Sequence, residues 1–479
     1  MSTVRTIAKN TLSLTVAEVI TKILAFILVI FVARYLGDVG YGKYAFALAF
    51  TSFFAIIADP GFSILTIREV ARDKELAGKY LGNISLVKFV LSFVAFLLVV
   101  IFINLMHYPY DTTLAVYIAG AYVVLTSFNQ FFISIFRAFE KMEYETVVRI
   151  IEKGILFSLV ISFIYLGYGL IEIVSAFLIS SIFSFVISGL VVLRKFTKPK
   201  FEIDFSFLKH ATKEALPFAL TAVFTVIYFR IDTVLLSMMK GDAVVGWYNA
   251  AYNIIFGLMV IPAVYGTVVF PTMSRYFKSS MNSFDKIGVL SFKYLLMIGL
   301  PVSIGVTLLA DKIIQIVYGS MYIHSAIALQ ILVWSFFIMC VCTVPSMGLN
   351  SANKQHVVTT GMGITATLNI ILNLVLIPKY SLVGAAIATI IVCFFEFFFE
   401  FHFMNKYAVK IRLINGDFVK VVFASFVMGS FLVYSQLNIF LTIILAALIY
   451  LLLVIILKAL SEEDLMMFRE IFSRRKVEE

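Results

Sequence analysis

Charged side chains stand inside stretches of the sequence that otherwise consist of apolar residues. The segment IYFRIDTVLLSMM (227–239) contains Arg230 and Asp232, and an apolar segment near the N-terminus contains Glu18 and Lys22. A charge inside a membrane helix costs a few kcal/mol, so such residues usually face the interior of a helix bundle or a water-filled cavity. The cations among them predict a binding site for an anionic substrate, with Asp232 and Glu18 as further site residues or counter-ions.

A purely structural role is the alternative for the same residues. Glu18 and Lys22 are one helical turn apart and can neutralise each other. Arg230 can extend its guanidinium to the membrane surface or pair with Asp232. The two residues are about 200° apart around a helix, so they need not face the same way.

Three further polar positions stand within apolar segments. Asp59 precedes Pro60 in the stretch ADPGF, where proline removes a backbone donor and predicts a kink. Asp59 then either reaches a cavity or caps the second part of the broken helix. Asn369 and Asn373 are one turn apart, and we expect them to join helices by hydrogen bonds.

The remaining residue types give few signs of chemistry. Glu396, Glu400 and His402 stand near the end of an apolar stretch, where we expect water to reach them. The 3 cysteines lie in predicted membrane spans and the 5 histidines have no ligand spacing, so neither disulfides nor a metal site is expected. There is no P-loop, zinc motif or nucleophile elbow, and no cofactor is expected.

The composition places these charges in a membrane protein. Apolar residues make up 62% of the 479 residues and charged residues 14%, against about half and about a quarter in a soluble domain. At about 20 residues per span, the chain is predicted to be an all-α polytopic membrane protein with about 14 transmembrane helices. The expected spans are 12–35, 42–66, 82–105, 113–136, 147–167, 170–193, 216–239, 244–272, 290–310, 325–349, 356–377, 381–404, 418–435 and 437–457.

The basic residues indicate how the chain is oriented. Of the 38 Lys and Arg residues, 30 fall in the termini and loops on one side of the expected spans, 5 on the other side and 3 within spans. Because cytoplasmic loops are rich in Lys and Arg, both termini are expected in the cytoplasm and the protein in the plasma membrane. The net charge of +10 then reflects topology and contact with anionic membrane lipids, not nucleic acid.

Short motifs recur along the chain and predict an internal repeat. GDVGYGKY (37–44) matches GDAVVGWY (241–248) at an offset of 204, RAFEK matches NSANK at an offset of 213, and YGL matches YSL at an offset of 212. The expected organisation is a six-helix half over 1–195, a second half over 196–410, and two extra helices with an amphipathic cytoplasmic tail over 411–479. An even number of helices per half makes this a parallel repeat, as in transporters that rock two halves around a central site.

The repeat relates the charged positions to one another. At the offset of 204, Arg230 corresponds to Phe26, which is one turn from Lys22 and two turns from Glu18. Glu18, Lys22 and Arg230 therefore share one pseudo-symmetric face. If that face points between the halves, it forms a charged patch in a central cavity.

Four stretches resemble the polysaccharide flippases, the Wzx-like branch of the multidrug/oligosaccharidyl-lipid/polysaccharide exporter superfamily. They are FRIDTVLLSMMKGDAVVGWYNAAY, ARYLGDVGYGKYAFA, RAFEKMEY and LNSANKQH. The resemblance covers nearly the whole chain and implies that a polyprenyl-linked oligosaccharide is flipped from the cytoplasmic to the outer leaflet by alternating access. Glycan assembly enzymes are then possible partners, and a monomer is expected.

The resemblance also implies roles for the charged residues. Lys22 and Arg230 would hold the phosphate or diphosphate, with Arg34, Arg68 and Arg72 contacting it at the mouths of the cavity. A coupling ion, Na⁺ or H⁺, would bind at Asp232, Glu18 or Asp59, and the sequence does not choose among the three.

Other functions stay open at this point. A multidrug or cation antiporter of the same superfamily calls for a mainly acidic cavity, whereas two cations and two anions are found here. A lipid II-type flippase is a close cousin in the same superfamily and stays open as an alternative. A polytopic glycosyltransferase belongs to another class and usually needs a large external loop with catalytic acids or a metal motif, but the external loops here are short.

Overall fold

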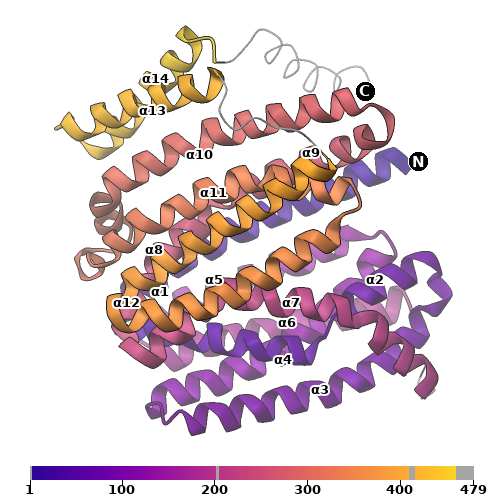
Figure 1. The fold of residues 1–479 in the computed structure, drawn as a ribbon. Helices are drawn as coiled ribbons and strands as arrows, with labels where there is room; N and C mark the ends of the chain where they lie inside the picture. The colour runs from indigo at the N-terminus through magenta and orange to yellow at the C-terminus, as the bar shows by residue number, and fades with distance from the viewer. Residues whose placement is uncertain (1–2, 201–203, 409–415, 460–479) are drawn as a thin grey trace. The chain divides into compact units, whose positions relative to one another are not determined.

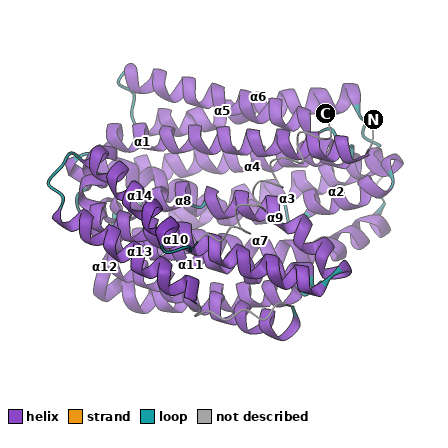
Figure 2. Ribbon diagram, turned by 90° about the horizontal axis from the view of Figure 1, so that it is seen from above, coloured by secondary structure: helices purple, strands orange, loops and turns teal. Residues whose placement is uncertain are grey.

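The computed structural model describes residues 3–200, 204–408 and 416–459, with side chains from Ile20 onward. Within these ranges the elements are helices joined by short turns, and no strand is found (Figure 2). The α-helices are α1 (Thr3–Ala58), α2 (Phe62–Arg72), α3 (Ala77–Leu105), α4 (Tyr110–Ala138), α5 (Met142–Tyr165), α6 (Leu170–Lys195), α7 (Phe205–Lys240), α8 (Asp242–Leu258), α9 (Val260–Ser279), α10 (Met281–Val317), α11 (Ser325–Ser351), α12 (Gln355–Tyr407), α13 (Gly416–Tyr434) and α14 (Ile439–Ile456) (Figure 1). The expected amphipathic tail lies outside the described residues.

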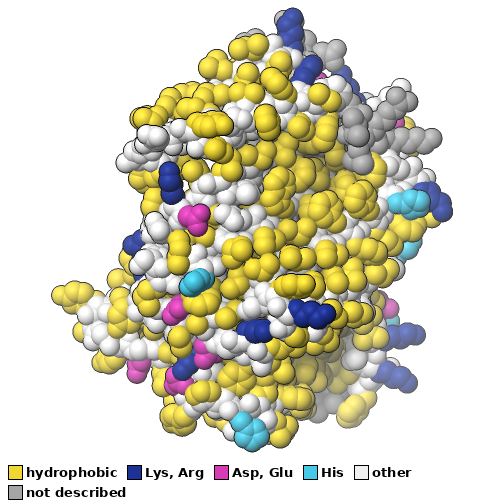
Figure 3. All heavy atoms as spheres, turned by 60° about the vertical axis from the view of Figure 1, so that its left-hand side comes forward, with side chains coloured by type: hydrophobic (Ala, Val, Ile, Leu, Met, Phe, Trp, Pro, Cys, Tyr) yellow, Lys and Arg dark blue, Asp and Glu magenta, His cyan; other side chains and the backbone are white. Residues whose placement is uncertain are grey.

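Eleven helices of the described ranges are long and apolar enough to cross a membrane. Two of them, α1 and α12, each contain two consecutive spans. The spans are divided where the backbone leaves the helical region, at Gly37 in α1 and at Ser381 in α12. Together with α5, these helices cover all 14 expected spans, so the all-α polytopic fold is confirmed. Figure 3 shows a face that is mostly hydrophobic with scattered charges, as expected for a surface in contact with lipid.

The helices pack into two compact units. Unit 1 comprises residues 1–260, 317–328 and 359–392, and unit 2 comprises residues 261–316, 329–358 and 393–479. Unit 1 therefore contains α1–α8 and residues 359–392 of α12. Unit 2 contains α9, most of α10 and α11, both ends of α12, and α13 and α14.

The closest helix contact in unit 1 joins the two copies of the GD motif. Gly37 and Gly241 both have positive φ angles (68° and 86°) with an extended ψ, a conformation that is nearly restricted to glycine. The helices that follow them meet face to face: a Cβ on Gly42 would lie 1.8 Å from the carbonyl oxygen of Asp242. A Cβ on Gly246 would lie 2.1 Å from that of Asp38. This reciprocal contact between equivalent residues supports the internal repeat.

The predicted kink in the second span is confirmed. α1 ends at Ala58 and α2 begins at Phe62, with Gly61 at a φ of 85° between them. The break leaves backbone groups without the hydrogen bonds that a continuous helix would provide, and side chains form hydrogen bonds with two of them. The Asp59 carboxylate accepts a hydrogen bond from the Ser63 amide at 3.2 Å, and the Ala58 carbonyl accepts one from the Lys88 ammonium at 3.2 Å.

In unit 2, α13 and α14 pack against each other and against α10. Their shared core contains Leu309, Met428 and Tyr450. An ion pair of 3.1 Å joins Lys293 of α10 to Asp417 of α13. The Tyr450 hydroxyl of α14 donates to the carbonyl of Met297 at 2.7 Å, so the two C-terminal helices are tied to α10 by polar contacts as well as by apolar packing.

Candidate functional site

Arg230 lies on α7 in unit 1 with a partly exposed side chain. Its guanidinium carbon is 5.9 Å from the centre of the Phe256 ring of α8. The group also interacts electrostatically with the hydroxyls of Tyr41 and Tyr44, two buried residues of α1. Arg230 does not pair with Asp232, so the pairing alternative is wrong. The guanidinium lies over an aromatic ring, and among the described residues none accepts a hydrogen bond from it, so its donors can bind a ligand.

The face of α1 that was predicted to match Arg230 lies against the same part of α8. The Phe26 ring, at the position equivalent to Arg230, packs on Gly257, where an added Cβ would lie 3.4 Å from it. Lys22 is one turn earlier on α1 and is exposed. Phe26 and Arg230 thus contact Gly257 and Phe256, two adjacent residues of α8. The two predicted faces therefore lie near the same end of that helix. The side chain of Glu18 lies outside the described residues.

Asp232 of α7 is a buried carboxylate, with 2% of its surface exposed. The Tyr248 hydroxyl of α8 donates to its Oδ2 at 2.7 Å, and the Thr389 hydroxyl of α12 donates to the same atom at 3.0 Å. The Asn373 amide of α12 donates to its Oδ1 at 2.8 Å. Asn369 in turn donates to the Tyr228 carbonyl at 3.2 Å, so the expectation that both asparagines join helices is confirmed.

The Asp232 cluster combines one carboxylate with neutral oxygen atoms in a buried site. Among the described side chains, no Lys, Arg or His forms an ion pair with Asp232, and the Asn373 Oδ1 atom has no hydrogen-bond partner. A buried carboxylate without a counter-ion is costly unless a cation or a proton accompanies it. Carboxylate, amide and hydroxyl oxygens are the ligands that hard cations take. The cluster is therefore chemically suited to one small cation.

Asp59 is placed elsewhere, in an ion pair with Lys88 of α3. Their Oδ2 and Nζ atoms are 3.1 Å apart, and the Lys88 side chain is fully buried. Lys88 also donates to the Ser127 hydroxyl of α4 at 2.7 Å, and Asp59 accepts a hydrogen bond from the Ser63 hydroxyl. With its charge matched by Lys88 and its oxygens bonded at the start of α2, Asp59 acts as a cap and counter-ion in this structure.

Arg34 and Arg68, two of the three arginines predicted at the mouths of the cavity, make local contacts in unit 1. Arg34 donates through Nε to the carbonyl of Val317 at 2.7 Å. Arg68 forms ion pairs with Glu69 at 2.6 Å and with Glu214 of α7 at 2.7 Å. These contacts hold the ends of segments together, and a role at a cavity mouth stays a prediction for both residues.

A neighbouring ion pair fixes the start of α7. Lys79 of α3 contacts Asp204 at 2.7 Å, and Asp204 also caps α7 by accepting a hydrogen bond from the Phe207 amide at 2.9 Å. The Lys79 ammonium, together with that amide, holds the pKa of Asp204 below its ordinary value. The cap carboxylate is thus charged where the positive end of the helix dipole favours it.

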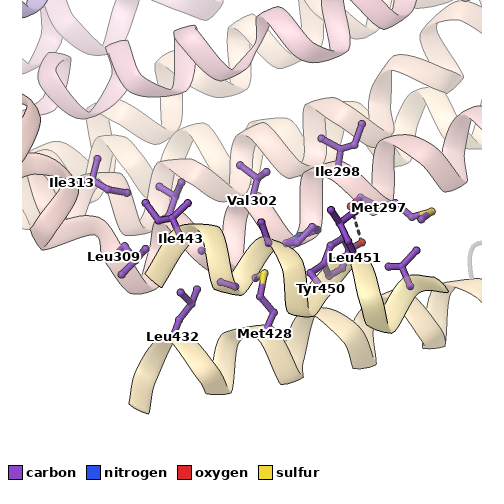
Figure 4. Close-up of a pocket in the computed structure, with 16 residues that line it drawn as sticks. Met297, Ile298, Val302, Leu309, Ile313, Met428, Leu432, Ile443, Tyr450 and Leu451 are labelled. Carbon is purple, nitrogen blue, oxygen red and sulfur yellow. Dashed lines mark hydrogen bonds between the residues drawn. The ribbon is translucent and has the colours of Figure 1, made fainter. Parts of the chain in front are cut away.

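Unit 2 contains an apolar groove between α10 and the pair α13 and α14. Its volume is about 490 Å³, and Met297, Val302, Leu309, Met428 and Leu451 are among the residues that line it (Figure 4). Figure 4 shows these side chains pointing into the space between the helices. A groove of this kind accepts a hydrocarbon chain and no charged group.

Sequence reasoning missed several residues of these clusters. Lys88 was left unassigned within a span, although a lone lysine there required a partner that Asp59 supplies. Tyr248 and Thr389 gave no signal, because a hydroxyl is common in membrane helices and its partner depends on how the helices are rotated. Water was expected to reach Glu400, and this prediction is wrong. The side chain is 2% exposed, because α12 turns it towards Cys342 of α11.

Comparisons with known proteins add the family. The family model described as polysaccharide biosynthesis protein matches residues 7–277, more than half of the 479 residues, and the MatE model matches residues 217–375. The chain is 24% identical to the uncharacterized membrane protein MJ1068 of Methanocaldococcus jannaschii over 64% of this chain, and it spans only 61% of that relative. It is 22% identical to the probable low-salt glycan biosynthesis flippase Agl15 of Haloferax volcanii, over 80% of each chain.

A solved structure shows the same fold. The lipid II flippase MurJ in an inward closed conformation superposes with a TM-score of 0.79 at 18% identity, covering 94% of this chain and 99% of that one. The arrangement of helices is thus that of a known polytopic membrane protein. With a family model matching over half of its length, the chain belongs to the polysaccharide biosynthesis protein family.

Proposed function

We propose that this protein flips a polyprenyl-(di)phosphate-linked oligosaccharide from the cytoplasmic to the outer leaflet by alternating access, and that it is a transporter and not an enzyme. The observation that carries the proposal is the position of Arg230. Its guanidinium stands over Phe256 without pairing with Asp232, and the Lys22 face of α1 lies against the same end of α8. Membership of the polysaccharide biosynthesis family and the name of the Agl15 relative support the substrate class.

The chemistry of the substrate headgroup fits the charged side chains of unit 1. A diphosphate is recognised by the planar fork of an arginine and the point charge of a lysine, which Arg230 and Lys22 supply. The polyprenyl chain is expected to stay in the hydrocarbon phase of the membrane. Glycan assembly enzymes are the partners that such a substrate implies.

The distribution of Lys and Arg supports the orientation. With 30 of the 38 basic residues on one side, we place both termini in the cytoplasm and the protein in the plasma membrane. The GD motifs then lie at the outer end of the helices. The division into halves at 1–195 and 196–410 is retained as part of the proposal, supported by the reciprocal contact of Gly42 and Gly246.

A second candidate is export of a drug or cation by exchange. The match of residues 217–375 to the MatE model favours it, because that region includes the buried carboxylate Asp232. It predicts a substrate that is cationic and binds to carboxylates. The test below separates the two candidates, since only the flippase requires Arg230.

Arg230→Ala is expected to reduce the flipping rate at least about 10-fold, because one charge-assisted contact contributes about 1.5–3 kcal/mol. Lys22→Ala should reduce it in the same direction, and Arg230→Lys should keep part of the activity because the charge remains. The measurement is translocation of a fluorescent polyprenyl-diphosphate sugar in proteoliposomes. The control is Lys209→Ala, which removes the same charge from an exposed position on the same helix.

Wild-type rates in both alanine variants, with folding and insertion intact, would show that these charges are structural. A wild type that moves no lipid-linked sugar would refute the proposed substrate, and export of cationic dyes would then be measured on the same vesicles.

Asp232→Asn is expected to abolish the dependence of transport on a cation gradient. The substitution keeps the shape of the side chain but removes the charge that draws a cation into the cluster. Transport is measured with a sodium gradient at constant pH and with a pH gradient at constant sodium. Asp311→Asn, at an exposed end of α10, is the control. If Asp232→Asn keeps the gradient dependence of the wild type, the coupling site lies elsewhere.

A further inference from the structure

Unit 2 holds a second buried carboxyl group that the proposed function does not use. Glu400, in the second part of α12, is 2% exposed. Within the described residues, its hydrogen-bond donor is the Cys342 thiol of α11, whose Sγ is 3.5 Å from Oε2. Among the described side chains, no Lys, Arg or His forms an ion pair with it. This residue belongs to unit 2, whereas Asp232 and its partners belong to unit 1.

These surroundings favour the neutral form of Glu400. A thiol is a weak donor, and a single weak hydrogen bond does not offset the loss of water around a carboxylate. Glu396 stands one turn earlier on α12 and interacts electrostatically with Glu400, so a second negative charge there is opposed. The other titratable neighbours are Cys342 itself and Cys393, which interacts with Cys342. Each of these named neighbours is an acid, so none of them can balance a negative charge on Glu400.

In the proposed repeat, the first half contains a related polar cluster in which the charge of the carboxyl group is matched by an ammonium group. At the offset of 213, Cys342 corresponds to Asn129, and at the offset of 212, Glu396 and Glu400 correspond to Ser184 and Ser188. Each half therefore carries a polar cluster at the same place in its helices.

In the first half, the carboxyl of this cluster is Glu152, and its charge is matched. The Asn129 amide donates to Glu152 at 3.3 Å and to the Ser184 hydroxyl at 2.6 Å, and the Lys153 ammonium is 3.1 Å from Glu152. The second half has carboxyl groups at two of the equivalent positions and a thiol in place of the amide, and among the described side chains no ammonium pairs with Glu400. A bound proton would balance Glu400 as Lys153 balances Glu152.

We propose that Glu400 is a proton-binding site of the second half, separate from the cation cluster at Asp232. In the conformation described, Glu400 holds the proton as a carboxylic acid. When water reaches the cluster, the proton passes to water and leaves the carboxylate behind. The inference does not depend on the substrate of the transporter, because the bound proton can be detected chemically.

The test is labelling of the full-length protein in membranes with dicyclohexylcarbodiimide. A protonated carboxyl group in apolar surroundings adds its O–H across the carbodiimide. The adduct then rearranges to a stable N-acylurea, and no leaving group is released. The adduct on Glu400 is quantified by peptide mass spectrometry at neutral pH and at pH about 10, where an unperturbed carboxyl has long been ionised. Glu143, which is exposed, is the internal control in the same sample.

We expect Glu400 to be labelled at neutral pH at least about 10-fold more than Glu143, and to lose the label as the pH rises. Glu396→Gln removes the neighbouring negative charge and should move the loss of label to lower pH, an effect that a purely structural role of Glu396 would not produce. Glu400→Gln imitates the protonated form, so it should fold as the wild type does and lack the adduct.

Labelling of Glu400 no stronger than that of Glu143 would overturn the proposal. So would a pH profile that Glu396→Gln leaves unchanged. Loss of the label on addition of sodium at constant pH would identify the ligand as a metal cation and would likewise overturn the assignment to a proton.

Discussion

Gly42→Ala is expected to lower the free energy of unfolding by about 3 kcal/mol or more, at or beyond the upper end of what overpacking costs. The added methyl group would lie 1.8 Å from the carbonyl oxygen of Asp242 and 2.6 Å from its carbonyl carbon. These are backbone atoms, so no side chain can turn aside, and α1 and α8 have to move apart. Gly246→Ala should act in the same way, because its methyl group would lie 2.1 Å from the carbonyl oxygen of Asp38.

The measurement is denaturant-induced unfolding of the purified protein in detergent. Gly154→Ala is the matched control, since this glycine of α5 has a helical backbone and no atom within 4 Å of an added Cβ. It should be neutral or stabilising by about 0.5–1 kcal/mol. The double variant Gly42→Ala/Gly246→Ala should cost less than the sum of the two, because both substitutions separate the same helices. If Gly42→Ala unfolds at the same denaturant concentration as the wild type, the close contact between Gly42 and Asp242 is refuted.

Lys88→Met is expected to destabilise the protein by about 3–5 kcal/mol, because it leaves the largely buried Asp59 carboxylate without its counter-ion. The loss should be largely reversed in Asp59→Asn/Lys88→Met, which removes both charges and keeps a side chain that can bond to Ser63. Unfolding in detergent again provides the measurement. Lys141→Met is the control, since this lysine is exposed and 3.9 Å from Glu143.

Lys88→Met and the double variant Asp59→Asn/Lys88→Met together separate the structural role of this pair from a role in transport. If Lys88→Met is as stable as the wild type, the ion pair contributes little, and Asp59 becomes available as the site residue that the sequence predicted. If the double variant is stable and still transports, the pair serves the fold alone.

The fold was predictable because membrane helices are marked by composition and length. The 14 spans follow from apolar stretches and turn residues, and the kink at Asp59–Gly61 follows from proline. The two GD motifs on which the proposed repeat rests were also visible, because Gly37 and Gly241 adopt a backbone conformation that other residues rarely adopt.

The partners of the polar residues were not predictable to the same degree. In helices such as α7 apolar residues occur on every side, so the sequence does not show which face packs against a neighbour. Arg230 and Asp232 were recognised by their charge alone, whereas Tyr248 and Thr389 became part of the cluster only through the rotation of α8 and α12. Glu400 was misjudged for the same reason, since its burial depends on α11.

The reciprocal contact at the GD motifs has a consequence for how this end of the molecule can open. It resembles the interface of a twofold-symmetric dimer fused into one chain, in which each partner offers the same patch to the other. Gly42 and Gly246 contact the residues at the start of each other's helix, so neither contact can be released while the other stays in register. Separation of α1 and α8 should therefore occur in a single all-or-none step, without a stable half-open intermediate.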